Sequence, residues 1–120
     1  MEQVQREMET SASPERVWAA LTRSDLLSQW FGAVAEIDAR PGGRAAFRWP
    51  DGRVRAAVVE VVVPERLLVL RWLPFEHDPQ GGIRQVPATE VRFTLRAAER
   101  GTLVQVSEGA HEAEMLGAAR

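Results

Sequence analysis

The sequence lacks cysteine and tyrosine altogether. Without cysteine, the chain has no disulfide, no thiolate nucleophile and no zinc site built on cysteine. Without tyrosine, general acid–base chemistry would fall to a glutamate, a histidine or an arginine. The two histidines, His77 and His111, lack the spacing of metal ligands, and Ser107 lacks the glycines of a nucleophile elbow. These patterns predict no metal, no cofactor and no catalytic residue.

Long apolar runs and an excess of one charge are also missing. No stretch of about 18 apolar residues occurs and residues 1–10 are polar, so we expect no membrane insertion and no signal peptide. The balance of 15 basic and 17 acidic side chains argues against nucleic acid as a partner. The length of 120 residues suits a single domain, residues 1–120, and we expect it to be cytoplasmic.

The segment from Ser13 to Gly32 predicts two short helices in succession. Ser13 is a favourable N-cap, and a proline follows it at the first helical position, where a missing N–H costs nothing. Ser24 is expected to cap the second helix, which ends at Gly32. Both helices present an apolar face, so they should cover part of a sheet.

The rest of the chain reads as strands joined by short turns. Residues 2–10 suit an edge strand, and Asp51-Gly52 is a strong hairpin signal. Short connections favour an antiparallel meander with one apolar face. Residues 74–87 are expected to form one long irregular loop that covers or gates something. The further strands are expected at residues 33–39, 44–50, 53–63, 67–73, 89–96 and 102–108.

Six side chains, five aromatic and one acidic, are candidates for a ligand pocket. Aromatic rings suit a flat or apolar ligand, although Phe47 and Phe93 are expected to serve mainly as core. The tryptophans and Phe31 near element ends fit either role. The candidates are Trp30, Phe31, Trp49, Trp72, Phe93 and Glu108.

Glu108 is the acidic candidate. It shares the alternation of Val104 and Val106, so a regular strand would point its carboxylate to the apolar side, where it can bind or protonate a ligand. If the strand ends at Ser107, Glu108 is solvated in a loop instead. Arginines in the strands are expected mostly on the solvated outer face, with Arg71 fitting either side. They are Arg44, Arg48, Arg53, Arg55, Arg71, Arg92 and Arg96.

Several segments in order resemble the activator-of-heat-shock-ATPase-like (AHSA-type) family of the START-like (SRPBCC), helix-grip superfamily. They are ASPERVWAALT, LLSQWFG, RPGGR, DG, VPERL, TEVRFTL, GT and VSEG, and the resemblance runs from about residue 4 to residue 109. The resemblance implies an α+β fold in which a curved antiparallel sheet of about six to seven strands wraps a long C-terminal helix. Two short helices after the first strand would close one end of a cavity between sheet and helix.

The resemblance also raises the question of what covers the apolar face of the sheet. The sequence ends at Arg120, where the long C-terminal helix would begin, so we expect a truncated form, a short tail helix or a second subunit in a homodimer. By analogy of fold, the leading function is binding of a small hydrophobic ligand. A polyketide cyclase- or aromatase-like enzyme is the alternative. Activation of a chaperone ATPase is disfavoured, since no charged docking run is visible.

Overall fold

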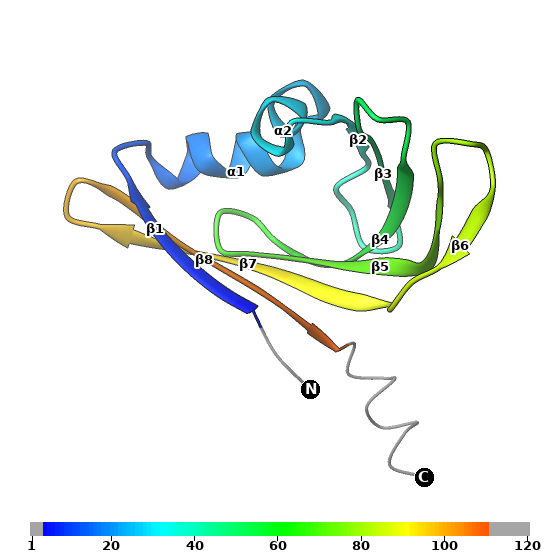
Figure 1. Ribbon diagram of the computed structural model, residues 1–120. Coiled ribbons are helices and arrows are strands. Elements are labelled where there is room, and N and C mark those ends of the chain that lie inside the picture. Colours follow the sequence, from blue (N-terminus) through cyan, green and yellow to red (C-terminus); the bar gives the residue numbers. More distant parts are fainter. Residues whose placement is uncertain (1–3, 111–120) are drawn as a thin grey trace, which may run out of the picture.

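The structure is a computed structural model that describes residues 4–110. Two helices follow the first strand, and seven further strands complete the described chain (Figure 1). The elements are β1 (Val4–Thr10), α1 (Pro14–Thr22), α2 (Ser24–Phe31), β2 (Val34–Ile37), β3 (Arg44–Arg48), β4 (Val54–Val63), β5 (Leu67–His77), β6 (Ile83–Gln85), β7 (Thr89–Ala98) and β8 (Gly101–Ala110).

All eight strands form one antiparallel sheet, in the order β1-β8-β7-β5-β4-β3-β2, with β6 paired to the end of β5. The sheet curves around the side on which α1 and α2 lie (Figure 1). Register shifts within the β4–β5 pair increase the local twist and help the sheet to bend. The predicted α+β helix-grip class is confirmed, with one strand more than expected. The expected C-terminal helix falls on residues 111–120, outside the described residues.

The helix pair begins and ends largely where the sequence predicts. The Ser13 hydroxyl accepts a hydrogen bond from the Arg16 N–H at 3.3 Å, and Gly32 ends α2 in the left-handed conformation. The prediction that Ser24 caps α2 is wrong, because no side chain caps this helix. The Ser24 hydroxyl instead accepts the N–H of Ile37 at 3.0 Å and so holds the outer edge of β2.

Both helices anchor to the concave face of the sheet through fully buried leucines. Leu21 of α1 and Leu27 of α2 join a cluster of aromatic and aliphatic side chains from five strands. The contributions of the sheet to this cluster are Ala35, Ala45, Phe47, Ala57, Val59, Leu68, Leu70, Trp72, Val91, Phe93 and Leu95. Among residues 4–110 the helices cover only part of the concave face, and the cavity described below lies on the other part.

The prediction of one long loop over residues 74–87 is wrong. β5 continues to His77, and β6 returns beside it as a short hairpin whose turn is organised by Asp78. Pro74 is tolerated inside β5 because no β4 residue pairs with it where the β4–β5 register shifts. The hairpin therefore lengthens the sheet at one end and adds side chains to its concave face.

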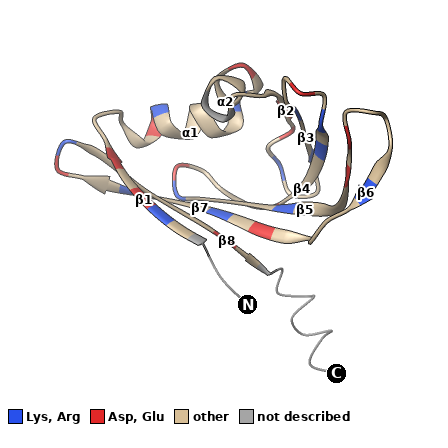
Figure 2. Ribbon diagram, in the orientation of Figure 1, with Lys and Arg blue, Asp and Glu red and all other residues tan. Residues whose placement is uncertain are grey.

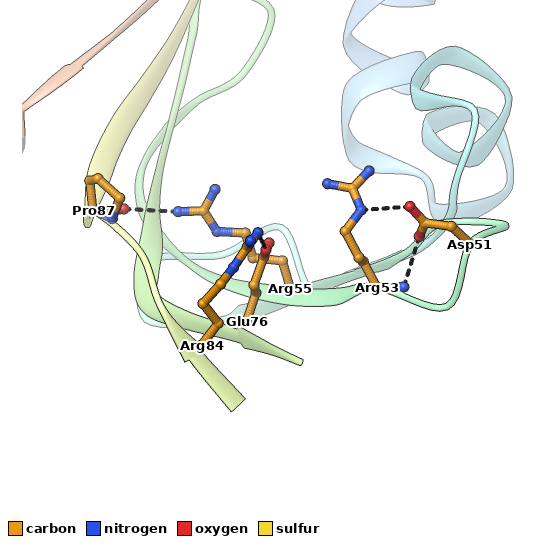
Figure 3. A network of polar contacts seen from close by, with 6 residues as sticks. All are labelled: Asp51, Arg53, Arg55, Glu76, Arg84 and Pro87. Atoms are coloured by element: carbon orange, nitrogen blue, oxygen red, sulfur yellow. Dashed lines mark hydrogen bonds and ion pairs between the residues drawn. The ribbon is translucent and has the colours of Figure 1, made fainter. Parts of the chain in front are cut away.

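Charged side chains of both signs are interspersed along the strands and turns (Figure 2). On the outer face they form ion pairs such as that of Arg71 with Glu60, at 3.2 Å. Among the described residues, no helix is long and apolar enough to span a membrane. The outer face thus follows the predicted pattern of a solvated surface, with two exceptions, Arg53 and Arg55, whose side chains point to the side on which the helices lie (Figure 3).

Candidate functional site

An apolar cavity of about 260 Å³ lies on the concave face, where β5, β7, β8 and β1 meet. Its floor comes from alternate residues of the three inner strands, so the side-chain alternation of each strand builds it directly. Arg6 and Glu108 add one charge of each sign. The lining residues are Arg6, Leu70, Trp72, Val91, Phe93, Val106 and Glu108.

A second hollow of about 380 Å³ lies under the helix pair. Leu21 and Leu26 of the helices face Met8 and Val104 of the sheet across it. Val104 precedes Val106 on the same face of β8, so the two hollows adjoin along this strand. Together they form an open apolar trough, in which the Met8 side chain is 44% exposed.

The predicted aromatic candidates separate into three groups. Trp72 and Phe93 are buried and line the cavity, where Trp72 also makes an edge contact to Phe47 at 5.1 Å between centroids. Trp49 is half-buried beside Phe47 and does not line the cavity. Trp30 and Phe31 belong to the last turn of α2, and their side chains lie outside what the structure describes.

Glu108 lies inside β8, which continues to Ala110, so it keeps the side-chain alternation of Val106. Its carboxylate reaches the cavity and accepts a 2.6 Å hydrogen bond from the hydroxyl of Thr89 on the neighbouring strand. A carboxylate held this way has a fixed orientation and remaining acceptor capacity. It can therefore accept a hydrogen bond from a ligand or exchange a proton with it.

Arg55 departs from the expectation that it belongs to the solvated outer face. It pairs across the sheet with the buried Phe47, and its side chain points to the side on which the helices lie (Figure 3). The guanidinium carbon lies 4.7 Å from the centroid of the Trp72 ring, and Nη2 donates to the carbonyl of Pro87 at 2.8 Å. Burial lowers the pKa of Arg55, while the carboxylates of Glu76 and Glu108 act in the opposite direction.

Glu76 is a buried acid that sequence reasoning missed, with an exposed fraction of 5%. It forms an ion pair with Arg84, its cross-strand neighbour on β6 (Figure 3). Arg55 is its cross-strand neighbour on β4. Glu76 therefore lies between two arginines in the sheet, Arg55 on β4 and Arg84 on β6.

The alternation of side chains along each strand indicates that both Arg55 and Glu76 face the concave side. Arg55 has the parity of Ala57 and Val59, and Glu76 has the parity of Leu70 and Trp72. The preference of arginine for solvent and the presence of Pro74 outweighed that signal in the sequence reading. Within the described part of the chain, no group of acidic or histidine side chains could hold a metal ion.

Comparison with solved structures shows the same fold in several proteins. A protein from Mesorhizobium loti matches with a TM-score of 0.77 and 24% identity, over 98% of this chain and 82% of that one. DynU16, a protein in the dynemicin biosynthetic locus, matches with a TM-score of 0.75 and 21% identity. The match covers 98% of this chain and 42% of DynU16. The Aha1 dimer from Colwellia psychrerythraea matches with a TM-score of 0.72 and 23% identity, over 99% of this chain and 84% of that one.

The sequence itself matches a family described as Activator of Hsp90 ATPase homolog 1-like protein, over residues 11–119. No curated protein matches the chain. The family match covers nearly the whole sequence, and the curved sheet with two helices after β1 is the fold of its structural neighbours. The chain therefore belongs to the Activator of Hsp90 ATPase homolog 1-like family of the START-like superfamily.

Proposed function

We propose that the chain binds a small hydrophobic molecule in the cavity over Trp72 and Phe93. The observation that carries this proposal is an apolar, concave surface with only a few polar groups at its edge, which is typical of small-molecule sites. A ligand that buries about 200 Å² of apolar surface there gains about 5 kcal/mol before the costs of association. The adjoining hollow under the helices gives a longer ligand room to extend.

The proposal is tested with N-phenyl-1-naphthylamine, a neutral aromatic probe that fluoresces in apolar surroundings. We expect saturable binding to the native protein. Val106→Phe places a ring in the cavity and should weaken probe binding at least about tenfold, since it occupies the volume that the probe needs.

Leu103→Phe is the matched control, because Leu103 is on the same strand with the opposite alternation and lies outside the cavity lining. It should leave probe binding unchanged. Absence of saturable binding to the native protein, or equal binding by Val106→Phe, contradicts the proposal.

A second candidate function is polyketide cyclase-like catalysis in the same cavity. It is favoured by the hydrogen-bonded Glu108–Thr89 pair, because a carboxylate can exchange a proton with a bound ligand, and by Arg55 over Trp72, because a guanidinium can orient the ligand. The structural likeness to DynU16, from a biosynthetic locus, is consistent with it.

On the catalytic alternative, Glu108→Gln should lower turnover of a substrate about a hundredfold or more while probe binding stays within about threefold. Gln keeps the acceptor for the Thr89 hydroxyl and loses the negative charge and the proton exchange. Thr89→Ala serves as a comparison that removes the hydrogen bond and keeps the carboxylate. An unchanged rate in Glu108→Gln rules this carboxylate out.

Self-association is a competing use of the same surface. The exposed Met8 and the open trough beside it would suit a second copy of the chain, and the Colwellia relative is a dimer. A dimer formed this way would occupy the hollow that a ligand needs. Subunit number and ligand occupancy therefore have to be measured together.

A further inference from the structure

Arg55 is a partly buried cation that lies over Trp72, a lining residue of the cavity, and among the described residues no carboxylate forms an ion pair with it. Its guanidinium makes one hydrogen bond, to the Pro87 carbonyl, and its Nε–H has no acceptor among the described residues. The Trp72 ring covers one face of the guanidinium. Other arginines of the strands and turns do have ion pairs, namely Arg53, Arg71, Arg84 and Arg92.

The carboxylates near Arg55 already have other partners. Glu76 is paired with Arg84, and Glu108 accepts the hydroxyl of Thr89. Both act on Arg55 through space without forming an ion pair with it. A partly desolvated cation that lacks a direct counter-ion is unfavourable, so an anion that reaches the terminal N–H groups of the Arg55 guanidinium gains both charge and hydrogen bonds.

Arg6 adds a positive charge on the β1 side of the cavity, four strands away from Arg55 in the sheet. It lines the cavity from β1, beside Val106. Three arginines, Arg6, Arg55 and Arg84, therefore stand against two glutamates, Glu76 and Glu108. The difference of one positive charge suits a ligand with a single negative charge.

We propose that the ligand is an amphipathic monoanion whose carboxylate or similar acidic group binds Arg55 while its apolar body lies over Trp72 and Phe93. This inference rests on the proposed ligand-binding function and specifies the chemical class of the ligand. A guanidinium stacked on a ring is oriented in advance, so it offers its planar N–H groups to an oxyanion at little cost in side-chain entropy.

The experiment compares two probes that differ by one acidic group. 8-Anilinonaphthalene-1-sulfonate is N-phenyl-1-naphthylamine with a sulfonate added, so the ratio of their dissociation constants measures the contribution of the anion. We expect the native protein to bind the sulfonate at least about tenfold more tightly, as a charge-assisted hydrogen bond allows. In Arg55→Gln this preference should fall to about twofold or less, with binding of the neutral probe unchanged.

Arg53→Gln is the matched control. Arg53 also lies over a tryptophan, at 5.0 Å from the Trp49 ring, but its charge is paired with Asp51 at 2.8 Å. This variant should keep the full preference for the sulfonate. If Arg55→Gln does not fold, Arg55→Lys tests the inference instead, because lysine keeps the charge and lacks the planar guanidinium. In this variant the preference for the sulfonate probe should fall at least about threefold.

Two outcomes separate this inference from the proposed function. If the neutral probe binds in the cavity and the sulfonate shows no preference, or keeps its preference in the Arg55 variants, the anionic headgroup is wrong and ligand binding stands. If neither probe binds the native protein, the proposed function itself is overturned.

Discussion

Phe47 is the residue on which the packing under the site depends most directly. Its side chain is fully buried, and its ring meets both Trp72 and Trp49. We expect Phe47→Ala to lower the free energy of unfolding by about 3–5 kcal/mol, because it removes apolar contacts and leaves a cavity beside Trp72. Urea unfolding followed by tryptophan fluorescence measures this.

Ala46 supplies the control for Phe47, since it is the preceding residue of β3 and faces outward. Ala46→Ser should change the free energy of unfolding by about 0.5 kcal/mol or less. A similar small effect of Phe47→Ala would mean that the ring does not hold β3 and β5 together.

Single residues of the site were only partly predictable from the sequence. Alternation alone placed Glu108 and Phe93 on the apolar side. The same rule applied to Arg55 would have put it beside Phe47, but a guanidinium usually faces solvent, and the stacking on Trp72 and the carboxylates nearby offset the cost of its burial only in part. Such compensation depends on tertiary contacts that a sequence pattern does not contain.

At the scale of elements, α2 holds the edge strand β2 through serine hydroxyls. The N–H of Ala35 donates to the Ser28 hydroxyl at 2.8 Å, and Ala35 is 3% exposed. Ser28→Ala should leave this buried N–H without an acceptor and lower the free energy of unfolding by about 1–3 kcal/mol. Amide hydrogen exchange at Ala35 should become faster in the variant.

The comparison for Ser28 is Gln29→Ala, at an exposed position of the same helix. It should leave both the free energy of unfolding and the exchange at Ala35 nearly unchanged. If Ser28→Ala behaves in the same way, the Ser28 hydroxyl of α2 does not stabilise the edge strand β2.

Elements were predictable where local chemistry decides them. Ser13, Gly32 and the Asp51-Gly52 turn act within a few residues, and the structure has a helix cap, a helix end and a hairpin there. The β5–β6 hairpin was missed because its strand contains Pro74. Proline is acceptable at that point only because β4 has a register shift opposite it, which is a property of the pair of strands.

For the whole molecule, the order of strands and the position of the helix pair followed from short connections and one-sided hydrophobicity. The sequence pattern did not predict what covers the concave face. The pattern of one strand reports which of its side chains are apolar, but not which element or molecule packs against them. The trough along β8 is the consequence: the fold builds its apolar floor, and the occupant that we propose for it is a small hydrophobic ligand.

Native mass spectrometry of the undenatured protein with added N-phenyl-1-naphthylamine tests this central claim most directly, because one spectrum reports both subunit number and bound probe. We predict one probe molecule per chain, and its loss in Val106→Phe but not in Leu103→Phe. A dimer without any bound probe would contradict the account, since the concave face would then serve self-association and not ligand binding.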